Sequence, residues 1–224
     1  QNRLAEALVE FEHAARIKTA LWGTDNLDAA RSEGNVALVL AKLGRLDQAL
    51  AQSQRVLGVY AKWIPEDAYW RATSLDNHSY ILWRLGRLQE AEGVAQEVLR
   101  MASPAQHATR RTTGNAMRTL GLIAMERRLF PSAIETLERA LELQQDGGES
   151  PFEVAETKFA LARGFEAAGA DRRRVEQLAD EALTTFSSAT TFAAKRQEVA
   201  TWLDRHPRRR AVSSSRKVGP TEDR

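Results

Sequence analysis

The chain has 224 residues, and its 32 lysines and arginines exceed its 30 aspartates and glutamates, giving a formal charge of +2. Hydrophobic residues make up 43% and charged residues 28%, a composition typical of folded globular proteins and too apolar for a chain that is disordered throughout. Cysteine is absent, which excludes disulfides and cysteine-ligated metal sites, and no run of about 18 apolar residues, the length that crosses a bilayer, occurs.

A repeat of 42 residues organises the chain from its first residues onward. The motif Arg-Leu-x-x-Ala begins at Arg3, recurs at Arg45 and recurs again at Arg87. The same step connects small and aliphatic residues in columns, among them Ala7, Ala49, Ala91 and Ala133, and also Ala15, Leu57, Leu99, Leu141 and Leu183. A fixed period of this length predicts a stack of helical units that bury one another's faces.

Each unit is predicted to hold two antiparallel helices. In the first full unit an apolar stripe with three-and-four spacing predicts a helix over about 27–43, Gly44 ends it, and a second helix follows over about 46–62. Small residues are expected where helices cross closely, at Ala37, Ala49, Gly121, Ala133 and Ala140. Trp63 and Trp70 are expected to pack between repeats. No alternating strand pattern occurs, so the predicted class is all-α.

The helical units define the predicted domain organisation. Residues 1–206 form one repeat domain: the second helix of a truncated unit at 1–22, full units at about 23–64, 65–105, 106–147 and 148–187, and a capping helix at about 191–204. Residues 207–224 carry six basic and two acidic groups and almost no apolar ones, which predicts a disordered basic tail and leaves residues 1–206 with a net charge of −2. Because the chain opens inside a repeat motif, we expect it to be a fragment of a longer protein.

The repeat motif resembles a known family. With Leu-Gly-Arg-Leu-x-x-Ala at 43–49 and again at 85–91, the chain resembles the tetratricopeptide repeat family, in the 42-residue form found in kinesin light chains and many bacterial regulators. The resemblance implies a right-handed superhelical solenoid whose first helices line a concave surface that binds proteins. The sequence departs from the pattern at Arg127-Arg128, which replaces the Leu-Gly turn, and near Ala168–Ala170, where one residue is inserted.

A second resemblance concerns the C-terminal part of the chain. The segments 153–163 and 198–206 resemble the end of repeat arms on bacterial serine/threonine protein kinases. This implies a cytoplasmic sensor or scaffold arm with a kinase domain upstream, and that domain would be an intramolecular partner. The 224 residues contain no His-Arg-Asp loop, no Asp-Phe-Gly and no glycine-rich phosphate loop.

Catalytic and metal-binding patterns are also missing from the sequence. The four histidines lack partners at helical metal-site spacing, and His78 falls in an apolar column, where a buried and hydrogen-bonded role is expected. No nucleophile elbow or phosphate-binding loop occurs. We therefore predict no enzyme activity, no metal and no cofactor, although a cryptic active site is kept as a third hypothesis.

The residues expected to bind a partner are implied by the family's groove positions. Mapped by the 42-residue step, these positions are Arg31, Asn35, Leu38 and Lys42; Asn77, Tyr80, Trp83 and Arg84; Arg118, Thr119, Leu122 and Met125; and Arg163 and Glu166. Asn35 and Asn77 match asparagines that hold a peptide backbone in the related repeats. The excess of arginine favours an acidic or phosphorylated segment. The alternative for each apolar or aromatic position, Trp83 included, is packing between repeats.

The tail supports two further hypotheses. Arg209 and Arg210 precede Ser213 at the spacing that basophilic kinases accept, which makes Ser213 a candidate phosphorylation site, and the alternative is a solubilising unfolded end. The tail and exposed arginines could instead contact nucleic acid, as in the arm of a transcription regulator. The acidic body counts against this second function. The sequence contains no membrane-binding pattern.

Overall fold

The computed structural model of the chain describes residues 2–63, 69–101, 107–170 and 172–206. All regular elements in these ranges are helices, which confirms the predicted all-α class. They are α1 (Asn2–Trp22), α2 (Leu27–Lys42), α3 (Leu46–Trp63), α4 (Tyr69–Arg84), α5 (Leu88–Met101), α6 (His107–Glu126), α7 (Phe130–Asp146), α8 (Pro151–Ala167), α9 (Arg172–Ser187), the 3₁₀ helix η1 (Thr190–Phe192) and α10 (Ala193–Arg205). The basic tail with Ser213, and the boundaries predicted between units at about 64–65 and 105–106, lie outside the described residues.

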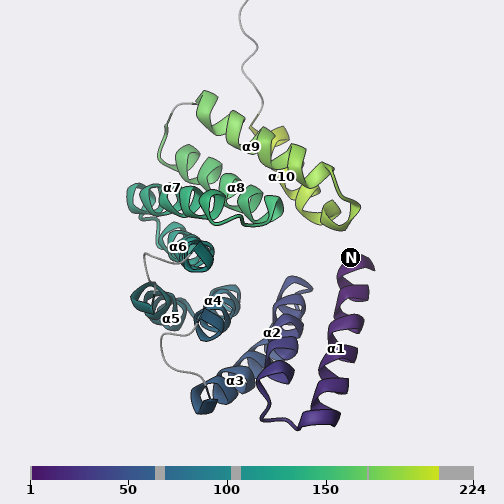
Figure 1. The fold of residues 1–224 in the computed structure, drawn as a ribbon. Coiled ribbons are helices and arrows are strands. Elements are labelled where there is room, and N and C mark those ends of the chain that lie inside the picture. The colour runs from purple at the N-terminus through teal and green to yellow at the C-terminus, as the bar shows by residue number, and fades with distance from the viewer. Residues whose placement is uncertain (1, 64–68, 102–106, 171, 207–224) are drawn as a thin grey trace, which may run out of the picture.

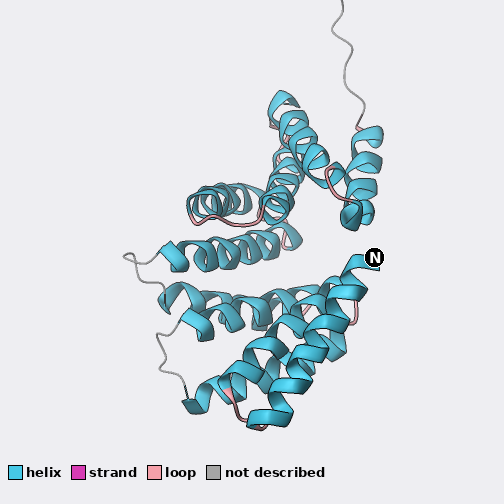
Figure 2. Cartoon of the chain, turned by 45° about the vertical axis from the view of Figure 1, so that its right-hand side comes forward, coloured by secondary structure: helices cyan, strands magenta, loops and turns pink. Residues whose placement is uncertain are grey.

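The helices form a curved stack of pairs (Figure 1). Helices that follow one another in the chain pack together, as α2/α3, α4/α5, α6/α7 and α8/α9. The alternate helices α2, α4, α6 and α8 also contact one another in turn and form the inner layer of the stack. Figure 2 shows the same pairs from a second side. None of the helices in the described ranges has the length and apolar character of a membrane span.

Turns within the pairs repeat one geometry. After α2, the N–H of Gly44 bonds to the Ala41 carbonyl and the N–H of Arg45 to the Leu40 carbonyl, and Gly44 takes a φ of 82°. Gly86 takes 75° at the matching place after α4. After α6 the residue is Arg128, which adopts a φ of 61° with the same pair of hydrogen bonds. A side chain in this left-handed region is strained, so the departure noted in the sequence keeps the turn at an energetic cost.

Helices α6 and α7 cross closely at glycine residues. A Cβ added to Gly121 would stand 2.6 Å from Leu137 Cγ, and one added to Gly147 would stand 2.7 Å from the Arg111 backbone nitrogen. Ala133 and Ala140 on α7 are completely buried. The expectation that Gly121, Ala133 and Ala140 occupy crossings is confirmed, as it is for Ala37 and Ala49, which are also buried.

A chain of buried polar groups crosses the same region. Gln144, fully buried on α7, donates from its amide nitrogen to Asn115 Oδ1 on α6 and accepts from Thr157 Oγ1 on α8, each at 2.7 Å. Asn115 in turn donates to Glu149 at 2.7 Å. Each of these groups has a partner, so the network fixes the relative positions of three helices without an unpaired polar atom.

The C-terminal helix closes the apolar core of the last pair. Val199 of α10 is fully buried in a cluster with Phe159 of α8 and Phe186 of α9. The Phe152 and Phe192 rings stack at 4.0 Å between centroids, which attaches η1 to α8. This arrangement confirms the predicted capping helix.

Two tryptophans lie differently from the expectation. Trp63 is 60% exposed and Trp70 is 43% exposed, so the prediction that both pack between repeats is wrong. Trp63 is the last residue of α3 and Trp70 the second of α4, and each projects at a helix end beyond the packed interface. Trp70 is instead covered on one side by Arg31, whose guanidinium carbon lies 5.0 Å from the ring centroid.

The two ends of the stack meet. The 3₁₀ helix η1 contacts α1, and Figure 1 shows the N-terminus beside α10. Lys42 at the end of α2 also pairs with Glu153 on α8, with 2.5 Å between Nζ and Oε1. The curved stack is therefore closed into a ring around its inner layer.

Candidate functional site

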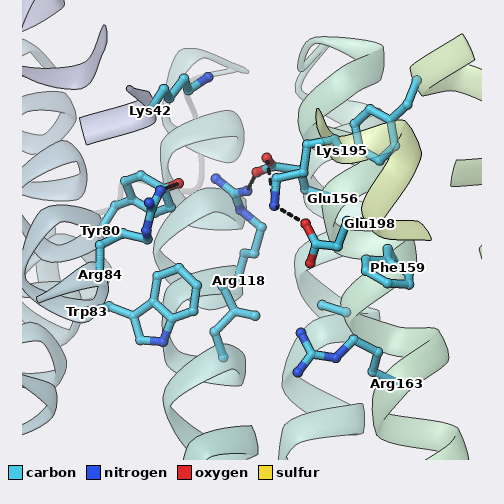
Figure 3. A pocket seen from close by; sticks show the side chains of 13 residues that line it. Lys42, Tyr80, Trp83, Arg84, Arg118, Glu156, Phe159, Arg163, Lys195 and Glu198 are labelled. Atoms are coloured by element: carbon cyan, nitrogen blue, oxygen red, sulfur yellow. Dashed lines mark hydrogen bonds and ion pairs between the residues drawn. The ribbon is translucent and has the colours of Figure 1, made fainter. Parts of the chain in front are cut away.

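A cavity of about 310 Å³ opens on the inside of this ring, and we call it the inner pocket. Its walls come from α4, α6 and α8 with the end of α2 and one side of α10 (Figure 3). It is lined by Lys42, Tyr80, Trp83, Arg84, Arg118, Leu122, Glu156, Phe159, Ala160, Arg163, Phe186, Lys195 and Glu198. Seven of the groove positions expected from the sequence meet here. A neighbouring hollow of about 180 Å³ shares six of these residues and extends to Leu4 and Phe192, where the ring closes.

Residues that are 42 apart line the inner pocket, as in Lys42 and Arg84 or Tyr80 and Leu122, but a second step, of 38 residues, also runs through it. Lys42, Tyr80, Arg118 and Glu156 stand at this interval, and all four line the pocket. The difference of four residues is about one helical turn. Each unit of a superhelical stack is rotated relative to the one before it, so the inward-facing position moves one turn toward the N-terminus of each successive inner helix.

The column of Asn35, Asn77 and Thr119, at steps of 42 residues, does not line the inner pocket. Asn35 is exposed but lies outside the inner pocket, and Asn77 is half-buried. Thr119, the next member, is 1% exposed and cannot contact a partner in this structure, because it packs inside the stack. Thr119 therefore leaves the set of binding candidates.

Two other groove candidates also lie away from the inner pocket. Met125 packs against α8, where its sulfur would lie 3.2 Å from a Cβ added to Gly164. Arg31 covers Trp70.

Arg118 occupies the floor of the inner pocket with its charge already paired. Its side chain is 8% exposed and reaches Glu153 at 2.8 Å and Glu156 at 2.5 Å. Burial lowers the pKa of Arg118, but the negative charges of Glu153 and Glu156 more than offset this effect. The net shift of the Arg118 pKa is therefore upward. Its Nε has no partner in the described part of the chain.

Glu153 is held between two cations. Burial alone would raise its pKa, but Arg118 and Lys42 lower the pKa of Glu153 to about 2. For Lys42, burial lowers the pKa and Glu153 more than restores it, so the net shift is upward. The three groups form a charged cluster that joins α2, α6 and α8.

These pairs reduce the excess of basic charge that the sequence predicts for the groove. From the sequence, Lys42 and Arg118 were expected to be cations available to a partner. In the structure Lys42 pairs with Glu153, and Arg118 pairs with Glu153 and Glu156. Lys195 of α10 is likewise shared by Glu156 at 3.8 Å and Glu198 at 3.2 Å. The sequence analysis did not single out these carboxylates. The 38-residue step from Arg118 to Glu156 is the signal that could have located one of them.

Arg84 and Arg163 remain without a carboxylate partner among the described residues. Arg84 donates to the Tyr80 hydroxyl at 3.0 Å, and its guanidinium carbon lies 5.8 Å from the Tyr80 ring centroid. Arg163 is exposed on α8, and Figure 3 places it across the pocket from Arg84 and Trp83. Five cations and three carboxylates form the pocket and its floor, so these two arginines account for its net charge of +2.

Asp76 is a buried carboxyl behind the pocket. It lies on α4, is 7% exposed, and is near Arg118 and Glu153. Burial raises the pKa of Asp76 to about 7; Arg118 opposes the shift and Glu153 adds to it. The sequence analysis did not identify Asp76.

The described side chains of His78 and His206 form a hydrogen bond and an ion pair rather than a metal site. His78 is buried, its Nδ1 lies 2.8 Å from Ser53 Oγ, and burial lowers its pKa, which confirms the hydrogen-bonded role expected for it. His206 Nε2 contacts Glu166 Oε1 at 2.7 Å across two helices, a pairing that spacing along the sequence did not reveal. Across the described ranges, no three histidine or acidic side chains gather as metal ligands would.

Comparisons with known proteins agree with this fold. A family model described as "Tetratricopeptide repeat" matches residues 28–103 and 70–146, which together cover more than half of the chain. No curated protein sequence matches the chain significantly.

Among solved structures, the chain is similar to BtubC (BKLC) from P. vanneervenii, with 21% identity, a TM-score of 0.55 and coverage of 89% of this chain and 72% of that one. It is also similar to a substituted form of a putative kinesin light chain from Podosopora anserina with nearly identical TPR-like repeats, with 18% identity, a TM-score of 0.50 and coverage of 84% and 88%. At these identities the likeness concerns the fold alone, and it agrees with a helical-repeat solenoid.

Proposed function

Because the chain belongs to the tetratricopeptide repeat family, whose members act as protein–protein interaction scaffolds, we propose that it binds a segment of a partner protein in the inner pocket without catalysing a reaction. The inner pocket lies on the inner helices, where stacked helical repeats present their concave surface. A volume of about 310 Å³ accepts one or two side chains of the segment rather than its whole length.

The two unpaired arginines carry the proposal for the kind of segment. Arg84 and Arg163 lie on different walls of the pocket and have no carboxylate partner within the described chain. An arginine can hold a carboxylate or phosphate with two parallel hydrogen bonds. A phosphorylated side chain placed between them would nearly neutralise the remaining charge of the pocket, and a single carboxylate would halve it.

Apolar groups beside these arginines favour a mixed segment. Trp83 lies 5.7 Å from Tyr80 between ring centroids and lines the pocket together with Leu122 and Phe159. Aromatic side chains that are partly exposed in a pocket often dominate the binding energy of an interface. We therefore propose a segment in which an apolar side chain stands next to an acidic or phosphorylated one.

Selection from a random-peptide display library tests this proposal. Peptides selected on the wild-type chain should be enriched in acidic residues next to apolar ones, and their affinity, measured by isothermal titration calorimetry, should fall by about tenfold or more in the double variant Arg84→Ala/Arg163→Ala. Replacing the acidic residues of a selected peptide by amides should cause a similar loss.

The matched control is Arg100→Ala/Arg139→Ala, which removes the same charge from helices α5 and α7, outside the inner pocket. This variant should bind the peptides as the wild type does. If the two double variants lose affinity equally, the effect is one of overall charge and the inner-pocket proposal is wrong.

The cellular context of the binding is a finer part of the same proposal. The resemblance of segments 153–163 and 198–206 to kinase repeat arms supports a regulatory arm of a cytoplasmic bacterial signalling protein, with a kinase domain as the partner in cis. A kinase domain from such a protein, added as a separate chain, should compete with the selected peptides. Failure to compete would remove this context and leave the inner pocket unaffected.

A further inference from the structure

A second groove lies on the other side of the inner layer, and we call it the outer groove. It has a volume of about 940 Å³, with residues of α1 and α3 on its sides and residues of α2 between them. Glu33, Val36 and Leu40 of α2 line it. At about 100° per residue these three share one face of the helix, and Lys42, which lines the inner pocket, lies on the opposite face. The two sites are therefore separated by α2.

Glu33 is the unusual residue of the outer groove. Its side chain is 5% exposed, and only one carboxylate oxygen has a partner, Arg55 of α3. The other oxygen, Oε2, is buried without a hydrogen bond in the described part of the chain. A buried acceptor without a hydrogen bond lowers the stability of the fold. The fold gains nothing visible from this cost.

The equivalent positions in the other repeat units show which residue type packing favours at the place of Glu33. Steps of 42 residues lead from Glu33 to Leu75, Met117 and Phe159, all apolar. Leu75 and Phe159 are buried in their units. An acid thus replaces an apolar core residue in the one inner helix that faces the outer groove. Local departures of this kind, made at a cost in stability, are expected at binding sites.

The rim of the groove supplies the complementary charge. Arg16 of α1 and Arg45, the residue before α3, line it, and neither has a carboxylate partner among the described residues; the Arg45 side chain donates to Gln48, at 2.5 Å. With Arg55 they give three arginines against two acids, Glu12 and Glu33. A bound segment therefore meets positive charge at the rim and one hydrogen-bond acceptor at the floor.

From this arrangement we infer that the outer groove is a second binding site, for an acidic segment of a partner protein that donates an N–H or O–H to Glu33. The acidic groups of the segment pair with Arg16 and Arg45. A neutral donor suits Glu33 because Arg55 already balances its charge. The site does not depend on the inner pocket.

The experiment starts from a chain whose inner pocket is disabled. A random-peptide display library is selected on the Arg84→Ala/Arg163→Ala variant, so that binders must use another surface. The recovered peptides should be rich in acidic residues. Their affinity should fall by about tenfold or more when Glu33→Leu, or Arg16→Ala together with Arg45→Ala, is added to that variant.

Glu33→Leu also gives a readout that separates binding from folding. Leucine restores the apolar column and removes the unsatisfied oxygen, so we expect the melting temperature to rise while peptide binding is lost. Glu33→Gln serves as a second variant: it keeps the shape, and its single acceptor oxygen is engaged by Arg55, so binding should weaken in a folded chain.

Three results would overturn the inference. The first is that no peptides are recovered, or that the recovered peptides bind the chain with the added Glu33 or arginine substitutions as tightly as they bind the starting variant. The second is a lower melting temperature for Glu33→Leu, which would give Glu33 a structural role. The third is a concentration-dependent rise in mass of the wild type that Glu33→Leu abolishes, because the occupant would then be a second copy of this chain.

Discussion

Helices α6 and α7 approach so closely that a Cβ at Gly121 would stand 2.6 Å from Leu137, whereas α1 and α3 leave a groove of about 940 Å³ over α2. One buried polar side chain from each region differs in the same way, although Arg118 of α6 also has an Nε without a partner among the described residues. Gln144 in the first region has both ends of its amide bonded, and Glu33 in the second has an oxygen with no partner among the described residues. The difference indicates that the α6–α8 region is packed for rigidity and that the α1–α3 region keeps surface and hydrogen-bonding capacity for other molecules.

The largest expected effect tests the close packing of α6 on α7. Gly121→Ala places a methyl group against Leu137 at a distance that real Cβ atoms do not show, so the helices must move apart. We expect the free energy of unfolding, measured by urea denaturation, to fall by about 2–3 kcal/mol. The matched control in the open region is Gly58→Ala on α3, where nothing lies within 4 Å. It should raise stability by about 0.5–1 kcal/mol, since alanine favours the helix. Equal effects at the two sites would remove the contrast.

A second prediction concerns Asp76, at the border between the two regions. In the folded chain burial raises its pKa from 3.8 to about 7, so its contribution to stability is fully present below pH 3.8 and is lost as the pH rises to about 7. Asp76→Asn stays neutral at every pH. It should raise the free energy of unfolding by about 2 kcal/mol at pH 8 and change it little at pH 4.

Glu153 provides the opposite case for comparison. Its pKa is lowered from 4.5 to about 2, so its contribution is present above pH 4.5 and is lost as the pH falls toward 2. Glu153→Gln should therefore destabilise the chain at pH 7, where Asp76→Asn stabilises it. Parallel pH profiles of stability for the two variants would contradict this assignment.

The smallest expected effect lies in the turn between α6 and α7. Among the described residues, this turn holds the one residue other than glycine with a positive φ. Arg128 holds a φ of 61° where the preceding unit has Gly86 at 75°. Arg128→Gly should raise the melting temperature and the free energy of unfolding by about 1 kcal/mol, because glycine adopts this conformation without a Cβ clash. The reverse change, Gly86→Ala, should lower stability by a similar amount. A neutral result for both would show that the turns tolerate a side chain freely.

The fold could be predicted because its determinants recur along the chain. A column of small residues through Ala49 and Ala133 and the turn glycines Gly44 and Gly86 repeat at 42 residues, and each has a local reason in helix crossing or helix termination. The exposure of Trp63 and Trp70 could not be predicted from the repeat, because exposure at a helix end depends on where the neighbouring element stops.

The inner pocket could be predicted only in part. Seven of the predicted groove positions line it, Tyr80, Trp83 and Arg84 among them, whereas Thr119 and Met125 of α6 do not. Toward α6 and α8 the rotation between units changes which face points inward, and that rotation is a property of packing that a linear period does not contain. The pairing of Arg118 with Glu153 likewise depends on a contact between two helices.

The Lys42–Glu153 pair joins residues that are 111 apart in the sequence, and the contact of η1 with α1 joins the two ends of the stack. In an open solenoid each unit contacts only its neighbours, so the ends can unfold while the middle stays folded. Closure removes that freedom, since releasing either end breaks contacts at the other. The chain should therefore unfold in a single cooperative transition and fold more slowly than an open array of the same length, because a long loop must close before these contacts form.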